Sequence, residues 1–471
     1  MVDKQVIKRG IVNTIYVIGA QSVSFLLSIA RTLMLPMLLG VTNFGYWSVY
    51  LLYMSYAGVL ALGYNDGIYL KYGKYSYQDL PKKNFRSGLR LFILLQFVIT
   101  MLVCIFLLFE TNSDKQLALY WVAMNIPIAG LTGVFIYVLQ ITNQLKRYSF
   151  YSVLDKAIVL LAITVVFFLK IDNYLIIIIA DTISRLVVLI LLTITCRQLV
   201  FGKSEGSKAA LKELSDNIRV GIKLMAANFS GMLVLGLGRF IIERFESVEV
   251  YSKYSFALST TNLVLVFVSA VGLVVYPTLN RLEEKKIPIY FSQFNRILSI
   301  IMFALLIVFF PLKIFIDIYI PDYNSIFNYL PIVFSIVLIQ TKMQILINPF
   351  YKVLRKENAM LIANITGLLI SIISIIPLYL INQSVTMIAF GTMVAMSIRL
   401  YSSELYLRKI QNIKIDLSNM ITEITGVIIF IVCAYCSNVT LGFLFFFLIY
   451  SVYLLTQIKN IGLFLKRIVR R

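Results

Sequence analysis

Histidine is absent from this 471-residue sequence, and cysteine is scarce. The four cysteines lie in or beside apolar segments: Cys104, Cys196, Cys433 and Cys436. The last two form a Cys-x-x-Cys motif, but it falls inside a predicted membrane span and has no histidine to complete a metal site. The glycine-rich Gly-x-x-x-x-Gly-Lys-Ser/Thr motif is also missing, so ATP hydrolysis by this chain is not expected. We therefore expect no metal, no redox centre and no cofactor.

Charged residues are few for a chain of this length. They make up 14% of the sequence, whereas 60% of the residues are hydrophobic and the mean hydropathy is +0.87. A helix crosses the hydrocarbon core of a membrane in about 20 residues, and apolar runs of that length recur from end to end. The first run, from Ile11, continues past the length of a signal-peptide core without a small-residue cleavage site, so no signal peptide is predicted.

The apolar runs predict an all-α polytopic membrane protein of about 14 transmembrane helices. The predicted spans are 11–38, 45–64, 88–109, 117–142, 151–169, 174–195, 220–243, 251–276, 297–316, 326–348, 359–381, 385–407, 419–436 and 439–458.

Acidic residues are outnumbered, with 22 against 43 lysines and arginines, for a net charge of +21. In a soluble protein this charge would suggest nucleic acid, but in a membrane protein positive loops set the orientation. The cations gather at both ends of the chain and in the even-numbered connections, as at Lys82 and Lys83 or at Lys146 and Arg147. We predict a bacterial inner-membrane protein with both termini in the cytoplasm and no nucleic-acid partner. The outer connections are short, which argues against a glycan polymerase or ligase.

A weak internal repeat relates the two halves of the chain. Arg31 and Arg239 are 208 residues apart, and Tyr46 and Tyr254 keep that spacing. Two short basic motifs, at 145–147 and 183–186, recur at nearly the same offset. Six spans form the unit, an even number, so we expect two parallel six-helix lobes around a central cavity. The predicted division is 1–208 for the first lobe, 209–412 for the second, and 413–471 for two additional spans with a basic tail.

Polar residues inside the spans are the candidate site residues, because their insertion into lipid costs free energy. An arginine at the centre of a membrane helix costs about 3 kcal/mol. Unpaired cations in such a cavity favour an anion, and the arginine fork suits phosphate. The predicted anion-binding residues are Arg31, Arg239, Arg399 and Lys342. Tyrosines and polar residues on the same helix faces suit sugar hydroxyls. The predicted sugar-binding residues are Gln21, Ser28, Tyr50, Tyr53, Asn228, Tyr251, Asn262 and Gln344.

Structural roles compete with each of these predictions. Serines in spans often serve helix packing, tyrosines form interfacial belts, and long cationic side chains reach the headgroups. Asp181 and Arg185, four residues apart, are predicted to form a structural ion pair. Arg399 has no such acidic residue at the equivalent place.

Three short motifs resemble those of Wzx-type polysaccharide flippases. Leu39-Gly40-Val41-Thr42-Asn43-Phe44-Gly45-Tyr46-Trp47-Ser48 is similar to the family's Leu-Gly-x-x-x-Phe-Gly-x-Tyr/Trp-Ser signature. Tyr276-Pro277-Thr278-Leu279-Asn280-Arg281-Leu282 resembles its aromatic-Pro-x-Leu-x-Arg-Leu pattern, and Arg239-Phe240-Ile241-Ile242 its seventh span. The family often has an acidic residue just before that arginine, where this chain has Gly238.

The family belongs to the multidrug/oligosaccharidyl-lipid/polysaccharide exporter superfamily. The resemblance implies a flippase, not an enzyme, that moves undecaprenyl-diphosphate-linked oligosaccharide to the outer leaflet for O-antigen, capsule or exopolysaccharide assembly. It implies that Arg31 and Arg239 hold the diphosphate, with membrane lipid, a polysaccharide polymerase and a chain-length regulator as further partners.

Three alternatives remain open. A cation-coupled multidrug exporter of the superfamily would carry an acid in the first span, but no Asp or Glu occurs from Gly10 to Gly40. A peptidoglycan-precursor flippase would have more arginines in its first two spans. A membrane polymerase or glycosyltransferase would need catalytic acids, and buried carboxylates are expected to be scarce.

Overall fold

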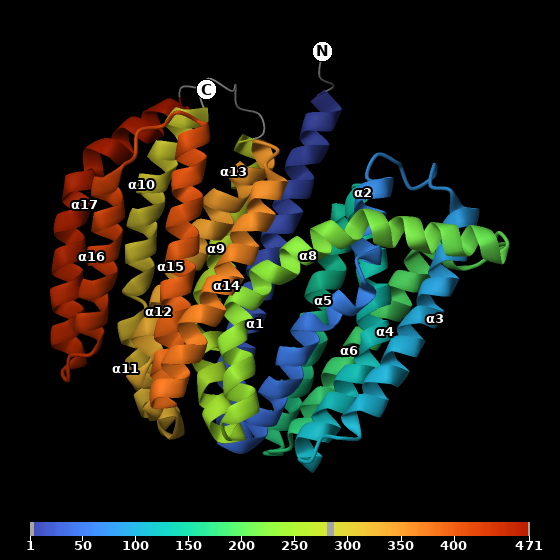
Figure 1. Ribbon diagram of the computed structural model, residues 1–471, viewed down its shortest axis with the longest axis horizontal. Helices are drawn as coiled ribbons and strands as arrows, with labels where there is room; N and C mark the ends of the chain where they lie inside the picture. Colours follow the sequence, from blue (N-terminus) through green and yellow to red (C-terminus); the bar gives the residue numbers. More distant parts are fainter. Residues whose placement is uncertain (1–3, 280–286, 470–471) are drawn as a thin grey trace. The chain divides into compact units, whose positions relative to one another are not determined.

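The computed structural model describes the backbone of residues 4–279 and 287–469. It describes the side chains of residues 22–263, 287–356 and 358–457. Within these ranges the chain is helical and contains no strand (Figure 1). The predicted cationic N-terminus, the connection around Arg281 and the basic tail lie outside the described side chains.

Twelve helical segments of the described residues are long and apolar enough to span a membrane. The difference from fourteen predicted spans has two causes. Helix α1 (Lys4–Tyr56) contains the first predicted span and most of the second, and the backbone between them departs from helical geometry at Gly40, where φ is 64°. Helix α9 (Val248–Leu279) carries the predicted span 251–276, but its side chains after residue 263 are not described. The prediction of an all-α membrane protein with about 14 spans is confirmed.

Apolar side chains on the outside of the helices show where lipid lies. Helix α3 (Lys82–Leu107) exposes Leu94, Phe97, Met101 and Ile105, at 53 to 68% of their surface. Their spacing of three to four residues places them on one helix face. A continuous apolar stripe of this kind is typical of lipid contact.

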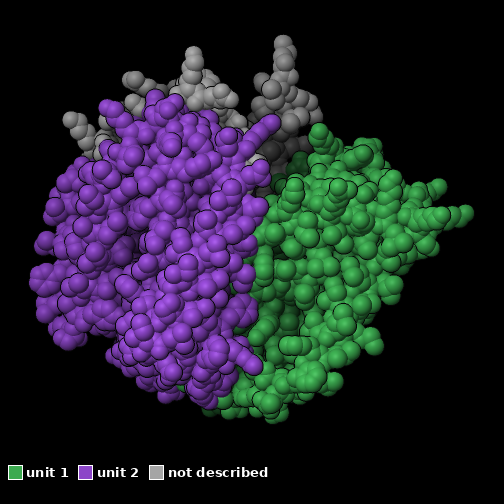
Figure 2. All heavy atoms as spheres, in the orientation of Figure 1, with its two compact units in different colours: residues 1–229 green, residues 230–471 purple. Residues whose placement is uncertain are grey.

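The chain forms two compact units, residues 1–229 and 230–471 (Figure 2). The first contains α1, η1 (Ala57–Ala61), α2 (Tyr64–Tyr72), α3, α4 (Ser113–Ile141), α5 (Leu145–Phe168), α6 (Tyr174–Thr195), α7 (Arg197–Val200) and the first part of α8 (Ser207–Phe245). The boundary lies inside α8, later than the predicted division at 208/209.

The second unit holds the rest of α8 and all later helices. These are α9, α10 (Ile287–Leu306), α11 (Phe309–Tyr319), η3 (Pro321–Asn328), α12 (Leu330–Lys342), the π-helical turn η4 (Met343–Ile347), α13 (Asn348–Val353), α14 (Glu357–Asn382), α15 (Val385–Ile410), α16 (Leu417–Ala434) and α17 (Val439–Val469). The two additional spans predicted for 413–471 correspond to α16 and α17, which belong to this unit.

Capping side chains mark where several helices begin after their short connections. Asn112 accepts a hydrogen bond from the backbone N–H of Lys115, and Asn173 accepts one from Leu175, each at 2.9 Å. Asp416 caps α16 in the same way. Each cap satisfies an N–H group that the first helical turn leaves without a partner.

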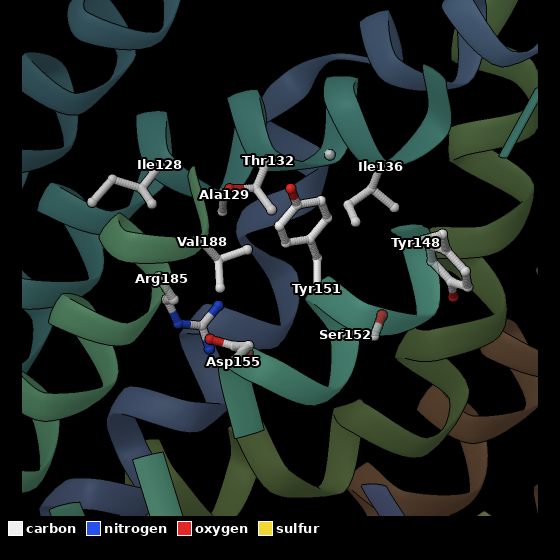
Figure 3. Close-up of a pocket in the computed structure, with 11 residues that line it drawn as sticks. Ile128, Ala129, Thr132, Ile136, Tyr148, Tyr151, Ser152, Asp155, Arg185 and Val188 are labelled. Carbon is white, nitrogen blue, oxygen red and sulfur yellow. The ribbon is translucent and has the colours of Figure 1, made fainter. Parts of the chain in front are cut away.

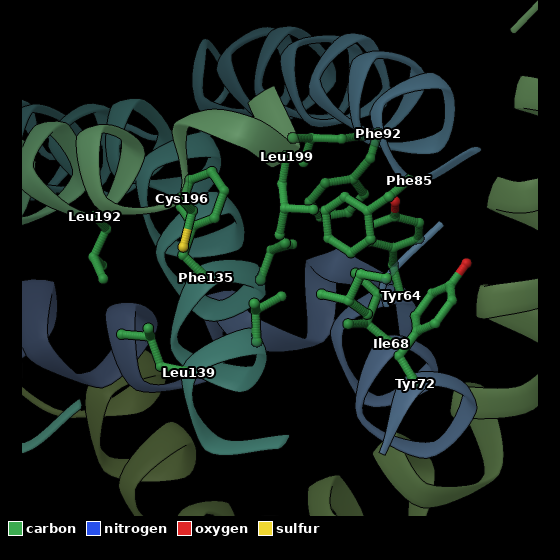
Figure 4. Close-up of a cluster of buried hydrophobic side chains, with 14 of the residues drawn as sticks. Tyr64, Ile68, Tyr72, Phe85, Phe92, Phe135, Leu139, Leu192, Cys196 and Leu199 are labelled. Carbon is green, nitrogen blue, oxygen red and sulfur yellow. The ribbon is translucent and has the colours of Figure 1, made fainter. Parts of the chain in front are cut away.

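The core of the first unit is aromatic at the level of α2 and α3 (Figure 4). The rings of Tyr64 and Phe92 stack at a centroid distance of 4.2 Å. Phe85, Phe135 and Leu139 complete the surrounding cluster. This packing joins α2 to the long helices α3 and α4.

Helix α8 begins with a segment that the sequence suggested was a basic connection. Figure 1 shows this segment running across one end of the first unit. It approaches α2 so closely that a Cβ atom on Gly67 would lie 1.9 Å from the carbonyl oxygen of Asn217. Glu213 of this segment accepts hydrogen bonds from Lys71 and Tyr72. Glycine contacts and the ion pairs of Lys71 with Glu213 and Asp216 therefore hold the start of α8 against α2.

Candidate functional site

The first unit contains a cluster of charged side chains between α1, α5 and α6. Arg185 Nε lies 2.7 Å from Asp181 Oδ2, which confirms the ion pair predicted one helical turn apart. Tyr50 Oη donates a hydrogen bond of 2.7 Å to the same oxygen. Asp181 is 1% exposed, so its charge is held by these two partners rather than by water.

Arg31 belongs to this cluster. It lies close enough to Asp181, Arg185 and Asp155 for their charges to interact. Lys156 in turn lies within range of Arg31 and Asp155. The cluster thus combines three cationic side chains with two carboxylates, which leaves a net positive charge inside a membrane-spanning unit.

Asp155 and Lys156 are functional candidates that the sequence interpretation missed. Both lie in α5, within the predicted span 151–169. The sequence feature that could have identified them is two adjacent ionisable residues inside an apolar run. Ionisable residues within a membrane span indicate a functional site. Asp155 Oδ1 accepts a hydrogen bond of 2.9 Å from Ser184 of α6, so the two helices are joined at this level.

A cavity of about 330 Å³ adjoins the cluster, between α4, α5 and α6 (Figure 3). Asp155 and Arg185 form part of its wall, together with Thr132, Tyr151 and Ser152. The remaining lining residues are Ile128, Ala129, Gly133, Ile136, Tyr148 and Val188. The α4 side of the cavity is therefore mostly apolar, with Thr132 as its polar residue, and the charged side chains of the wall come from α5 and α6.

In the second unit, Arg239 of α8 is grouped with tyrosines of α9. Tyr251, which is 1% exposed, hydrogen-bonds to Arg239, and Tyr254 lies within range of its charge. Among the described residues the Nε of Arg239 has no hydrogen-bond partner. The structure thus brings together two of the predicted residues, Arg239 and Tyr251.

Arg399 of α15 is 4% exposed and contacts α14 and α8. Its Nη2 donates a hydrogen bond to the side-chain oxygen of Asn364, and its Nε has no partner within the described side chains. Gly367 makes room for it, because a Cβ there would lie 2.7 Å from Arg399 Cδ. None of the carboxylates that the structure describes forms an ion pair with Arg399, so it is a buried cation held by a neutral amide.

Lys342 occupies a different environment. It is 0% exposed, and its Nζ lies 2.7 Å from Glu404 Oε2 and 2.8 Å from Glu423 Oε2. Arg408 forms a second ion pair with Glu404 at 2.8 Å. Buried carboxylates are therefore not scarce, contrary to our expectation, but these two are engaged by cations. The geometry gives Lys342 a packing role between α12, α15 and α16.

The sequence matches the model of a known protein family. The family model described as "Polysaccharide biosynthesis protein" matches residues 11–283, more than half of the chain. The chain belongs to this family. The match confirms the resemblance to Wzx-type flippases of the exporter superfamily. A sequence comparison with curated proteins gives no match.

Several solved structures of membrane transporters have a similar fold. The lipid II flippase MurJ in an inward closed conformation is 15% identical, with a TM-score of 0.69, over 96% of this chain and 100% of that one. An outward-facing multidrug resistance MATE transporter is 12% identical, with a TM-score of 0.56, over 85% and 94% of the two chains. An inward-facing MATE transporter has a TM-score of 0.55 at 11% identity, over 82% and 96%. At these identities the likeness shows the fold alone.

The other predicted sugar-binding residues of this chain do not gather at one place among the described residues. Ser28 donates a hydrogen bond of 2.7 Å to the carbonyl oxygen of Ser24 in its own helix. Tyr53 and Gln344 are half-buried, whereas Asn228 and Asn262 are exposed. The side chain of Gln21 lies outside the described residues, as does most of the motif that begins at Tyr276. Tyr50 contacts the charged cluster through Asp181, and Tyr251 hydrogen-bonds to Arg239.

Proposed function

We propose that this chain is a flippase for undecaprenyl-diphosphate-linked oligosaccharide repeat units. It moves them from the cytoplasmic to the outer leaflet of the bacterial inner membrane by alternating access, and it supplies O-antigen, capsule or exopolysaccharide assembly. Both termini lie in the cytoplasm. The family match and the transporter fold support transport of a lipid-linked substrate in general.

The observation that carries this proposal is the excess of cationic side chains inside the membrane-spanning units. Arg31 and Lys156 belong to a cluster with a net positive charge, and Arg399 is buried with no carboxylate partner among the described side chains. A buried cation that is not neutralised by the protein favours an anionic ligand. A diphosphate meets this requirement, because arginine and lysine bind phosphate oxygens through charge-assisted hydrogen bonds.

We assign diphosphate binding to Arg31, Arg239 and Arg399. Lys342 leaves this set, because two carboxylates already compensate its charge. Tyr50 and Tyr251 position Asp181 and Arg239 in this scheme rather than binding sugar directly. The protein performs no covalent chemistry on the substrate. Its role is to replace water around the diphosphate and the sugar hydroxyls, whose transfer into hydrocarbon would otherwise be prohibitively costly.

The decisive test replaces Arg31 and Arg239 with alanine, singly and together, in a strain that lacks the chromosomal gene. We expect surface polysaccharide to disappear while lipid-linked repeat units accumulate on the inner leaflet and the protein remains in the membrane. Arg197→Ala is the matched control, because Arg197 is exposed at the start of α7. Normal surface polysaccharide in the double variant contradicts the assignment.

A second candidate is a flippase for a peptidoglycan precursor, favoured by the similarity to the lipid II flippase MurJ over nearly the whole chain. The deletion strain separates the two functions. Loss of surface polysaccharide with normal growth and normal cell-wall crosslinking supports the first function. Growth arrest with accumulated cell-wall precursor supports the second.

A further inference from the structure

The cavity between α4, α5 and α6 has the chemical character of a binding site (Figure 3). Arg185 is fixed by Asp181 through its Nε, yet its side chain is 28% exposed where that of Asp181 is 2% exposed. Within the described residues its two terminal nitrogens make no hydrogen bond to another side chain. The buried carboxylate therefore orients a guanidinium whose remaining N–H donors are available at the cavity wall.

The carboxylate of Asp155 and the hydroxyl group of Thr132 also belong to the cavity wall. Asp155 uses one carboxylate oxygen to accept from Ser184, and none of the described residues donates to the other. Thr132 lines the cavity from α4, and its hydroxyl oxygen is buried without a hydrogen-bond partner in the described structure. A buried hydroxyl without a partner costs free energy, so a ligand that supplies one is favoured.

The aromatic residues of α5 complete the wall. Tyr148 and Tyr151 both line the cavity, and the hydroxyl group of Tyr151 is already hydrogen-bonded to Thr195 at 2.6 Å. Tyr151 therefore offers mainly the carbon surface of its ring. An aromatic face next to a carboxylate and a guanidinium suits a ligand with both C–H faces and hydroxyl groups.

We infer that this cavity binds one sugar residue of the transported substrate. Vicinal hydroxyls both donate and accept, which matches Asp155, Arg185 and Thr132 together. The Asp155 carboxylate in the wall disfavours a free phosphate. A lipid chain is also disfavoured, because it cannot form hydrogen bonds with the charged side chains of the wall. The volume of about 330 Å³ lies at the lower end of small-ligand pockets and fits a single sugar rather than a whole repeat unit.

The position of the cavity also selects which sugar enters it. Asp155 and Arg185 belong both to the cavity wall and to the charged cluster around Arg31. If Arg31 and Lys156 hold the diphosphate, the group nearest the cavity is the sugar attached directly to it. This inference rests on the proposed function and adds a specificity determinant to it.

The test measures binding of defined lipids to the purified full-length protein in lipid nanodiscs. The probes are undecaprenyl diphosphate alone and the same lipid carrying one glucose, galactose, N-acetylglucosamine or N-acetylgalactosamine. We expect at least one sugar-bearing lipid to bind about tenfold more tightly than the bare lipid, as one or two buried hydrogen bonds would provide. Ala129→Leu, which fills the cavity from α4, abolishes this preference, and Thr132→Val reduces it.

Matched controls are Ala162→Leu and Thr164→Val in α5, which do not line the cavity. The Thr164 hydroxyl is bonded to the Leu160 carbonyl of its own helix. Both controls retain the preference, and all four variants bind the bare lipid as the unaltered protein does.

Three results overturn the inference. They are equal affinity for bare and sugar-bearing lipids, an unchanged preference in both cavity variants, or an equal loss of affinity for all lipids in Ala129→Leu. Suppose that replacing Arg31 weakens binding of the bare lipid, but the cavity variants leave the preference for sugar-bearing lipids unchanged. This result supports the proposed function and contradicts the sugar site. If the bare lipid does not bind at all, both fall.

Discussion

Lys342 Nζ lies 2.8 Å from each carboxylate oxygen of Glu423, and both side chains are buried. The two residues come from α12 and α16, so this contact joins one of the last two spans to an earlier helix of the same unit. Asn419 and Ser299 donate further hydrogen bonds to Glu423. A buried pair with this many partners depends on each of them, because an unpaired charge in lipid or protein is costly.

Replacing Lys342 with methionine is therefore expected to destabilise the protein by about 3–5 kcal/mol, since it leaves two carboxylates partly uncompensated. Thermal unfolding of the detergent-purified protein measures the loss. Lys352→Met is the control, because Lys352 is exposed and its replacement is expected to change stability by less than about 0.5 kcal/mol. Adding Glu423→Gln to Lys342→Met recovers part of the loss, because Glu404 keeps its partner Arg408. Equal stability of Lys342→Met and the unaltered protein contradicts the structural role.

Arg399 is expected to respond in the opposite way. It is buried but has no carboxylate partner among the described residues, so Arg399→Met removes an uncompensated charge and leaves thermal stability unchanged or higher. Export of surface polysaccharide nevertheless falls by at least about tenfold if the guanidinium binds the diphosphate. Arg408→Met provides the comparison, because Arg408 is ion-paired to Glu404 and its loss lowers stability. An Arg399→Met protein that is stable and fully active contradicts the proposed role of Arg399.

The start of α8 is expected to tolerate no side chain at its contact with α2. A Cβ atom on Gly221 would lie 2.0 Å from the carbonyl oxygen of Gly63, which is backbone and cannot turn aside. Gly221→Ala is therefore expected to cost about 1–3 kcal/mol and to raise hydrogen exchange in α2. Gly58→Ala has nothing within 4 Å of the new atom and serves as the control. If both variants exchange at the rate of the unaltered protein, the close contact does not contribute to stability.

The connection before α16 predicts a specific pH dependence. Burial acts to raise the pKa of Asp416, but hydrogen bonds from Arg296 and from the Asn419 backbone outweigh it, so the pKa is lowered. A carboxyl group with a lowered pKa stabilises the fold above its unfolded pKa of about 3.9 and loses this effect as the pH falls through the folded value. Arg296→Met is expected to lower the unfolding temperature at pH 7 and to lose this difference as the pH falls from about 4 towards 3.

Asp416→Asn separates the ion pair from the helix cap, because an asparagine oxygen can still accept from the Asn419 backbone. It is expected to lower the unfolding temperature at pH 7 by the same small amount as Arg296→Met. An Arg296→Met effect that is constant from pH 7 to pH 3 argues against the ion pair.

Local and periodic features were readable from the sequence alone. Membrane spans need only a long enough apolar run, so the all-α membrane fold could be predicted without tertiary information. The Asp181–Arg185 pair could be predicted as well, because residues four apart on a helix are neighbours wherever the helix lies. The family resemblance rests on short stretches such as residues 39–48, which are local too.

The tertiary structure decided everything that depends on partners distant in the sequence. Lys342 and Glu423 are 81 residues apart, and Tyr50 and Asp181 are 131 residues apart, so neither contact has a spacing that a sequence pattern records. For this reason the sequence could not show that two carboxylates compensate Lys342, whereas the described partner of Arg399 is the neutral amide of Asn364. The predicted spans leave residues 196–219 as a connection, and only the close contacts of α8 with α2 show that part of it is a packed helix. Helix formation is a local property, but the compensation of a buried charge depends on which helices meet.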